Sequence, residues 1–433
     1  MNNFLKKLLI FIFITNCSLH KNSKLWSEKK IIKEKQENIK ELLKKEEKLS
    51  SEFNPNLRIS LYSKAIDKSF LNNFDNNNGR INFDGDLKSL SKYKFSKIKK
   101  FHQYNPQISI YNDDVIFFDS KGSILRFDND SDLVWKKNNY SKSEKKQNPI
   151  LFFKNNKKTL IVADNISKYY ALDINTGKIL WSKNNTAPFN SQLKIYKDKF
   201  FIIDYNNILR AYSIKDGNEI WKIKTENSLI RSQTKLSMVI IQNIIYFNNY
   251  SGDISSVDIE TGELLWQTPT QNNLIKDENF FLKTSDIVAD NDALYFSNNK
   301  NQFFSLDIKT GFLNWQQKVN SNLRPTLIDN YIFTISLSGH LIIIAKKSGN
   351  IIRITDIFEK FKNKKMNKIK PTGFIIGNNN VYLSTSYGRL MVIDIESGEV
   401  VNIIKVDNNK IARPIVLNKK MFITTDSSII KLN

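Results

Sequence analysis

The sequence predicts an all-β fold, an eight-bladed β-propeller made of four-stranded antiparallel blades. Three observations predict it. A short phrase recurs along the chain, its copies lie about 44 residues apart, and each copy places a turn between two stretches of alternating apolar residues. A four-stranded unit of about 44 residues has the length of a propeller blade. The chain is also 40% apolar and 12% aromatic, which is enough for a large core.

The phrase is clearest as YALDINTGKILW at Tyr170–Trp181 and SVDIETGELLW at Ser256–Trp266. Glycine is favoured in its turn because the backbone there needs a positive φ. The tryptophan lies on the following strand, where burial against the neighbouring unit contributes about 2–3 kcal/mol. One hairpin cannot bury this side chain alone, so the unit has to repeat. The repeat residues are Gly177, Gly217, Gly262, Gly311, Trp135, Trp181, Trp221, Trp266 and Trp315.

The number of blades follows from counting the strands around the phrase. Two short strands precede each copy, and seven complete units run from about Gln107 to Val406. The last stretch, Ile411–Leu432, supplies only three strands. We expect the missing outer strand to come from the N-terminal side, near Ile81–Lys94, because closing the ring removes exposed strand edges. Residues 81–433 therefore form the predicted propeller domain, with seven blades as the alternative count.

Residues 1–17 have the organisation of a secretory signal peptide. Lys6 and Lys7 precede an apolar run, Leu8–Ile14, that is too short to span a membrane. The chain's single cysteine, Cys17, ends this segment. One cysteine excludes a fold held by internal disulfides and a zinc site built on several thiolates.

The residues before Cys17 resemble the lipobox of bacterial lipoproteins, in which the cysteine is acylated and becomes the mature N-terminus. The resemblance implies a lipid anchor at Cys17, and Ser18 after it points to the outer membrane of a Gram-negative bacterium, on its periplasmic face. Asn16 departs from the lipobox pattern, in which the residue directly before the cysteine is usually Gly, Ala or Ser. An ordinary signal peptide with an incidental cysteine is the alternative.

Two segments separate this start from the predicted propeller. Residues 18–50 are rich in Lys and Glu, and 26–49 predict one solvated helix with ion pairs between successive turns. This helix is interpreted as a stalk, and a short coiled coil or partner-docking helix is the alternative. Residues 51–80 are irregular and rich in Asn and Ser, so they are predicted to be a linker.

The net charge of +23 comes from 66 Lys and Arg residues against 43 Asp and Glu. Lysine makes up most of these cations, whereas specific nucleic-acid readers favour the bidentate arginine fork, so nucleic acid is not an expected partner. The charge predicts attraction to acidic surfaces.

The sequence contains no recognisable catalytic constellation. It has no Gly-Lys-Ser/Thr phosphate loop, no His-Glu-x-x-His and no Gly-x-Ser-x-Gly. Asp128, Asp130 and Asp132 imitate the start of a calcium loop, but Leu133 stands where an EF-hand needs glycine. No catalytic residue, metal or cofactor is therefore expected.

Polar–Pro pairs precede several predicted innermost strands. Equivalent positions of successive blades form a ring around one mouth of the central channel, and three consecutive blades place Arg324, Lys370 and Arg413 there. This pattern predicts a cationic arc suited to an acidic partner surface. In the alternative reading the prolines only start inner strands and the charges are solvated.

The repeated phrase is similar to the tryptophan-docking repeat of quinoprotein-like (PQQ-repeat) propellers. One branch of that group holds dehydrogenases that carry pyrroloquinoline quinone and calcium. The other is the BamB family, propeller lipoproteins of the outer-membrane β-barrel assembly machine. The single cysteine cannot make the vicinal disulfide of many such enzymes, and the compact blades and lipobox-like start favour the BamB branch. A PQQ- and calcium-dependent dehydrogenase or a ligand-binding propeller remains the alternative.

This resemblance implies a non-enzymatic scaffold whose partners are the periplasmic domains of the barrel subunit and unfolded outer-membrane proteins. Ser228–Arg231 resembles the loop through which BamB proteins contact the barrel subunit. Leu229 and Arg231 become docking candidates by that resemblance, and Asp286 is the nearest match to the family's acidic loop residues. The 26–49 helix departs from the family's usual plan.

Overall fold

The computed structural model describes residues 51–66, 79–101, 106–225, 235–271, 282–359 and 369–433. The chain divides into two compact units, Met1–Lys48 and Leu49–Asn433. Cys17 and the predicted 26–49 helix lie outside the described residues. Within the described ranges, no helix is long and apolar enough to cross a membrane.

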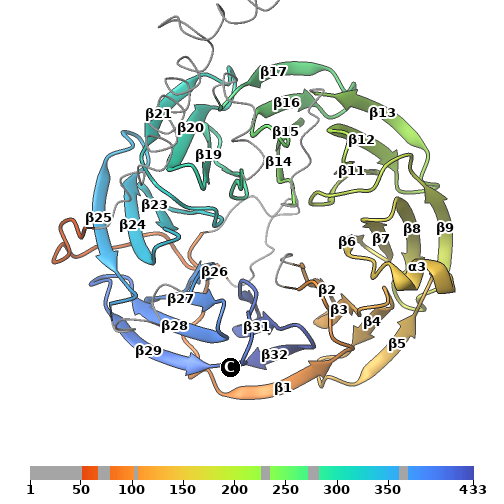
Figure 1. Ribbon diagram of the computed structural model, residues 1–433, viewed down its shortest axis with the longest axis horizontal. Helices are drawn as coiled ribbons and strands as arrows, with labels where there is room; N and C mark the ends of the chain where they lie inside the picture. The colour runs from red at the N-terminus through yellow and green to blue at the C-terminus, as the bar shows by residue number, and fades with distance from the viewer. Residues whose placement is uncertain (1–50, 67–78, 102–105, 226–234, 272–281, 360–368) are drawn as a thin grey trace, which may run out of the picture. The chain divides into compact units, whose positions relative to one another are not determined.

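Eight four-stranded antiparallel sheets stand side by side in a ring, so the predicted eight-bladed β-propeller is confirmed (Figure 1). The first four blades are β2 (Ser109–Tyr111), β3 (Asp114–Phe118), β4 (Ile124–Phe127), β5 (Leu133–Lys137); β6 (Leu151–Asn156), β7 (Thr159–Asp164), β8 (Lys168–Asp173), β9 (Ile179–Asn184); β10 (Lys194–Tyr196), β11 (Lys199–Ile203), β12 (Ile208–Ser213), β13 (Glu219–Lys224); and β14 (Met238–Ile241), β15 (Ile244–Asn248), β16 (Ile254–Asp258), β17 (Leu264–Thr268).

The next three blades are β18 (Val288–Ala289), β19 (Ala293–Asn298), β20 (Gln302–Asp307), β21 (Leu313–Gln317); β22 (Thr326–Ile328), β23 (Tyr331–Ile335), β24 (His340–Ala345), β25 (Ile351–Asp356); and β26 (Pro371–Ile376), β27 (Asn380–Thr385), β28 (Arg389–Asp394), β29 (Val400–Lys405). The eighth blade combines β30 (Ile415–Leu417), β31 (Lys420–Thr424) and β32 (Ser428–Leu432) with β1 (Ser89–Lys94) from the N-terminal side.

The ring closes where β1 pairs antiparallel with β32, with Tyr93 opposite Ile429. The expected N-terminal closing strand is therefore present, but it occupies only the last part of the predicted range. Ile81, at the start of that range, instead bridges Ile66 and donates its backbone N–H to Ile376 in the seventh blade. Closure leaves the eighth blade with a full set of four strands.

The blades pack through the repeated tryptophans. Trp181 on β9 donates its indole N–H to the carbonyl of Ile214 in the next blade at 2.9 Å. Its ring covers Gly217, where a Cβ atom would lie 2.6 Å from the indole and where φ is +70°. Glycine is therefore required at this turn both by backbone conformation and by the close approach of the ring.

The sixth blade departs from this pattern, because Arg353 takes the position of the tryptophan. Arg353 pairs with Ile343 immediately before the strand irregularity, as Trp181 pairs with Ala171 in the second blade. The side chain is fully buried. Its guanidinium donates to Ile395 of the seventh blade at 2.8 Å and to Leu57 of the N-terminal segment at 2.9 Å.

The segment expected to be a linker has defined contacts along residues 51–66. Phe53 forms an antiparallel bridge with Ile354, and the backbone N–H of Ile59 bonds to Glu396. The backbone N–H of Tyr62 donates to the carboxylate of Asp329 at 2.8 Å. This stretch therefore lies against the sixth and seventh blades.

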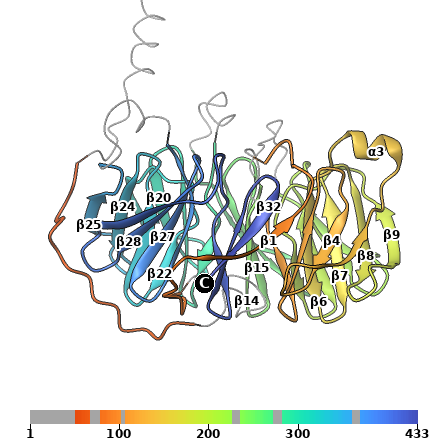
Figure 2. The ribbon, with the colours of Figure 1, turned by 90° about the horizontal axis from the view of Figure 1, so that it is seen from below.

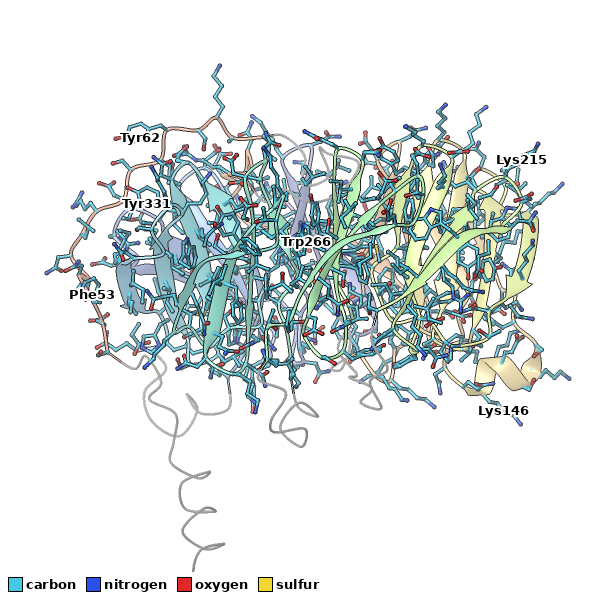
Figure 3. All side chains as sticks on the ribbon, turned by 90° about the horizontal axis from the view of Figure 1, so that it is seen from above. Phe53, Tyr62, Lys146, Lys215, Trp266 and Tyr331 are labelled. Atoms are coloured by element: carbon cyan, nitrogen blue, oxygen red, sulfur yellow. The ribbon has the colours of Figure 1, made fainter. Side chains whose placement is uncertain are left out.

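The ring has two faces, which we name by their loops. The connecting face carries the segments that join one blade to the next, the turns between second and third strands, and the short helix α3 (Lys142–Lys146) (Figure 2). The hairpin face carries the other turns of each blade. Figure 3 shows Lys146 on the connecting face and Lys215 on the opposite, hairpin face.

Candidate docking face

The connecting face is built on turns that polar side chains hold in place. Asp164 ends the second strand of its blade and accepts the backbone N–H groups of Ile166 and Lys168 at 2.9 and 2.8 Å. Asn249 accepts those of Ser251 and Asp253 in the same way. Such local bonds fix the turn backbone. These turns between the second and third strands are a second repeated feature of the blades. The sequence did not reveal it, because Asp, Asn, Ser or Thr can occupy the first position of the turn.

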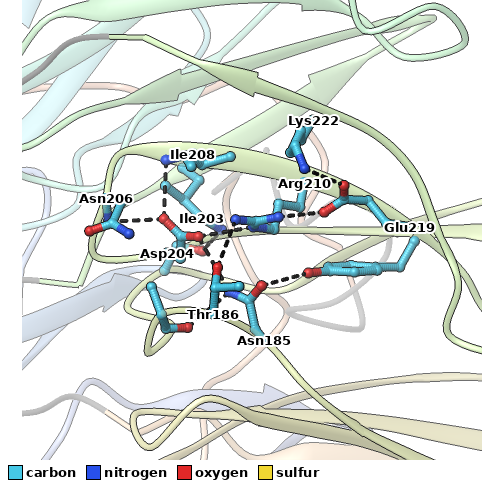
Figure 4. Close-up of polar contacts among 12 residues, drawn as sticks. Asn185, Thr186, Ile203, Asp204, Asn206, Ile208, Arg210, Glu219 and Lys222 are labelled. Carbon is cyan, nitrogen blue, oxygen red and sulfur yellow. Dashed lines mark hydrogen bonds and ion pairs between the residues drawn. The ribbon is translucent and has the colours of Figure 1, made fainter.

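Buried charges beneath this face are compensated within the blade. Asp204 accepts a hydrogen bond from Arg210 Nε at 2.9 Å, and Arg210 also pairs with Glu219 (Figure 4). Glu219 in turn pairs with Lys222 at 3.0 Å. Each buried charge therefore has an opposite partner, which offsets part of the cost of removing it from water.

A second buried carboxyl group lies next to α3. Burial raises the pKa of Asp164 to about 6, and the hydroxyl of Tyr140 donates to it at 2.6 Å. Burial also raises the pKa of Tyr140. Lys168 nearby pairs with Glu144 of the helix at 3.3 Å. The hydroxyl and two backbone N–H groups occupy the oxygens of Asp164, so its surroundings are those of a structural carboxyl group.

Cations gather where the inner strands begin on the connecting face. Lys235 and Arg324 precede the inner strands of the fourth and sixth blades, and the carboxylate Asp286 precedes that of the fifth. All three side chains are half-buried. Burial lowers the pKa of Lys235; Asp286 opposes this shift, whereas Arg324 adds to it. These three groups therefore lie within electrostatic range of one another at the mouth of the channel.

Two further lysines interact at the same face. Burial lowers the pKa of Lys410 to about 8, and the positive charge of Lys283 acts in the same direction. The ammonium group of Lys410 lies 5.8 Å from the ring centroid of Phe101. We use "cationic mouth" for Lys235, Lys283, Arg324, Lys410 and Arg413 together, with Asp286 as the carboxylate among them.

The structure places each residue of the predicted arc. Arg413 packs against Gly373 and donates Nε to the carbonyl of Phe374 at 2.8 Å. Lys370 is exposed; its backbone N–H donates to the hydroxyl of Ser386 at 3.0 Å, and its carbonyl accepts the backbone N–H of Ser386. Leu229 and Arg231 lie outside the described residues. The sequence pattern missed Lys235, Lys283 and Lys410, because no proline follows them to mark the position.

The side chains at this mouth do not fit a site for calcium and a quinone. Calcium takes six to eight oxygen ligands, whereas the described side chains of the cationic mouth are three lysines, two arginines and one carboxylate, Asp286. Across the described ranges, no cluster of three His, Cys, Asp or Glu side chains is arranged to hold a metal ion.

A family model described as outer membrane protein assembly factor BamB matches residues 120–355. The chain belongs to the BamB family. The match runs from the first blade into the outer strand of the sixth. No curated protein matches the chain.

Solved structures of two kinds share the fold. BamB from Moraxella catarrhalis is 14% identical with a TM-score of 0.65, over 80% of this chain and 99% of that one. Quinohemoprotein alcohol dehydrogenase from Comamonas testosteroni is 10% identical with a TM-score of 0.60, over 83% and 78%. A europium-containing methanol dehydrogenase is 11% identical with a TM-score of 0.60, over 80% and 87%. At such identities these likenesses establish the fold alone.

Proposed function

We propose that this protein is a non-enzymatic docking subunit that assists the assembly of outer-membrane β-barrel proteins. The observation that carries the proposal is the BamB family match over residues 120–355. A propeller suits this role because it is rigid and presents many loops on two faces. Its partners are the periplasmic domains of the assembly machine's barrel subunit and unfolded outer-membrane proteins.

The cationic mouth gives the docking surface its chemistry. Its five cations lie on one face of the ring, so the surface attracts an acidic partner and disfavours a basic one. Attraction of this kind speeds association and weakens as salt rises. Lys370 extends the same charge around the ring.

The family resemblance assigns the direct contacts to Leu229 and Arg231. The described residues on either side of that segment, Thr225 and Lys235, both lie on the connecting face, and Thr225 is held there by a backbone bond to Asn207. An apolar side chain beside an arginine is a common arrangement of binding hot spots. Asp286 supplies an acidic contact one blade further on.

In the proposed arrangement the protein is anchored at the periplasmic face of the outer membrane through an acylated Cys17. Residues 18–50 then connect the anchor to the propeller. This part of the proposal rests on the sequence alone. Labelling with an azide-tagged fatty acid tests it: Cys17→Ser abolishes labelling if the cysteine is acylated and leaves it unchanged if it is not.

Affinity capture of the barrel subunit tests the docking contacts. The variant Leu229→Ala with Arg231→Ala is expected to lose capture by about tenfold or more, because truncating two hot-spot side chains costs more than 1 kcal/mol each. The matched control is Leu265→Ala with Arg58→Ala, which removes an exposed leucine and an exposed arginine elsewhere. Equal capture by both variants would show that the contacts lie elsewhere.

A further inference from the structure

The hairpin face holds a cavity that the proposed docking function does not use. Its volume is about 1030 Å³, and its walls come from the inner strands β2, β6, β10 and β30. It therefore opens between the first three blades and the eighth. This position is on the opposite face of the ring from the cationic mouth.

The inner wall of the cavity is apolar, with amides above it. Ile108, Phe153, Ile195 and Leu417 line it and are each less than 10% exposed. Asn155 also lines the cavity and accepts a hydrogen bond from the hydroxyl of Ser109 at 2.8 Å. A ligand here meets an apolar surface first and side-chain amides beside it.

The rim is cationic. Lys154, Lys157, Lys197 and Lys215 line it, against two carboxylates, Asp113 and Asp198. Asp113 accepts a hydrogen bond from Asn418 at 2.7 Å, and Asp198 lies 3.8 Å from Lys199. Both carboxylates are thus engaged by neighbouring side chains, and Lys197 pairs with Glu260 at 3.3 Å. Lys157 and Lys215 are exposed, and the lysines that line the cavity outnumber the carboxylates two to one. The rim favours negative charge on a ligand.

The walls also present backbone groups to a ligand. In the described part of the chain, β2, β6 and β10 each stand innermost in their sheets and pair with one strand only. Their channel-side edges carry main-chain donors and acceptors, which are the groups that bind extended peptides. An inorganic anion gains nothing from the apolar wall or from the carbonyl groups of these edges.

The described residues of the N-terminal segment contact the other half of the hairpin face. Tyr62 bonds to Asp329 and Arg80 to the carbonyl of Asn378 at 2.7 Å, both at turns of the sixth and seventh blades. Figure 3 shows Tyr62 and Lys215 far apart on the same face. The segment described at 51–66 therefore packs on blades that do not line the cavity.

We propose that this cavity binds a short, extended peptide segment in which carboxylate side chains alternate with apolar ones. The apolar residues pack on Phe153 and Ile195, the peptide backbone bonds to the asparagine amides and strand edges, and the carboxylates lie against the rim lysines. Alternation fits because successive side chains of an extended peptide point in opposite directions.

The ligand preference is tested by fluorescence anisotropy with the full-length protein in detergent. The probe is a labelled eight-residue peptide of alternating Asp and Leu. Two matched peptides replace Asp by Asn or Leu by Ser. We expect each replacement to weaken binding by about tenfold, because it removes either the charged or the apolar contact. Equal binding of either matched peptide would overturn the proposal.

The location is tested with charge-reversal variants at exposed positions. The double variant Lys157→Glu with Lys215→Glu is expected to weaken binding of the Asp–Leu peptide by about tenfold or more. The control, Lys309→Glu with Lys347→Glu, makes the same charge change on the same face without lining the cavity. An equal loss in both would mean that net charge alone drives binding. Full binding by the first variant would place the peptide elsewhere, for example at the cationic mouth. Either result overturns the site.

Discussion

Arg353 shows how one residue can replace a repeated contact and add a new one. It takes the tryptophan's position in the sixth blade and reaches the carbonyls of Ile395 and Glu396 in the seventh. It also bonds to Leu57, so it ties the N-terminal segment to the ring. A tryptophan has one N–H and cannot make all these bonds.

Replacing Arg353 with leucine is expected to lower the free energy of unfolding by about 2–4 kcal/mol, because buried carbonyl groups lose their donor. Urea unfolding followed by circular dichroism measures this. Arg58→Ala is the control: that arginine pairs with Glu396 at 3.2 Å at the surface, and its loss is expected to cost less than about 1 kcal/mol. Similar losses for the two variants would contradict the role given to Arg353.

The lowered pKa of Lys410 predicts that the stability of the fold depends on pH. Its pKa in the folded protein is about 8, below the usual value of 10.5, so the unfolded chain binds the extra proton between these values. The folded state therefore gains stability from this group as pH rises from about 8 to 10.5, and the buried cation is unfavourable below pH 8.

Lys410→Met is accordingly expected to melt at a higher temperature than the natural protein at pH 7, with a gap that shrinks as pH rises through 8 to 10. Lys347→Met, at an exposed position, should show no such change. Thermal melts at a series of pH values decide the matter, and a gap that stays constant with pH would contradict the burial of a charged Lys410.

Sequence reasoning succeeds at the residue scale where residues repeat. The tryptophans and glycines of the phrase are periodic, so their positions and their contact were predictable. The partners of Arg353 come from Leu57 and Ile395, far away in sequence, and no period marks them. The neighbours of Lys410 are equally remote, since Phe101 and Lys283 lie on different connecting segments.

At the scale of the element, the second to the sixth blades each pack against a tryptophan from the blade before them. Trp221 donates to the carbonyl of Ile259 at 3.0 Å, and a Cβ atom on Gly262 would lie 2.7 Å from its ring. The two residues therefore belong to one contact. Their energies should be coupled, because each loses its packing when the other changes.

Trp221→Ala is expected to cost about 2–4 kcal/mol and Gly262→Ala about 1–2 kcal/mol, the latter because φ is +76° there. The double variant should cost less than the sum, since the clash with the indole disappears with the tryptophan. Urea unfolding of the three variants gives the coupling. Leu264→Ala, at a 40% exposed position nearby, serves as the control. Strict additivity would mean that the indole does not pack on the glycine.

The closing strand illustrates what element patterns predict. A missing fourth strand in the last blade required a partner from the N-terminal side, and β1 supplies it. Residues 51–66 lack alternation and read as a linker, yet they bond to the sixth and seventh blades. Their contacts are made with turns and carbonyl groups, which leave no pattern in the segment's own sequence.

At the scale of the whole molecule, the two faces of the ring carry different chemistry. The connecting face gathers the cationic mouth, whereas the hairpin face holds the N-terminal segment and the lysine-rimmed cavity. The sequence named Arg324 and Arg413 as residues of the mouth, because equivalent positions of a propeller form a ring, and their role in binding stays a prediction. The cavity depends on the packing of four inner strands, and its lysines are not distinguishable by pattern from the many others in the chain.

The most direct test of the docking function is affinity capture of the tagged, full-length protein from gently solubilised membranes, with the bound proteins identified by mass. We expect recovery of the barrel subunit of the outer-membrane assembly machine at low salt, and progressive loss as salt rises, because a cationic surface makes the contact. Capture that lacks the barrel subunit even at low salt would contradict the proposed function.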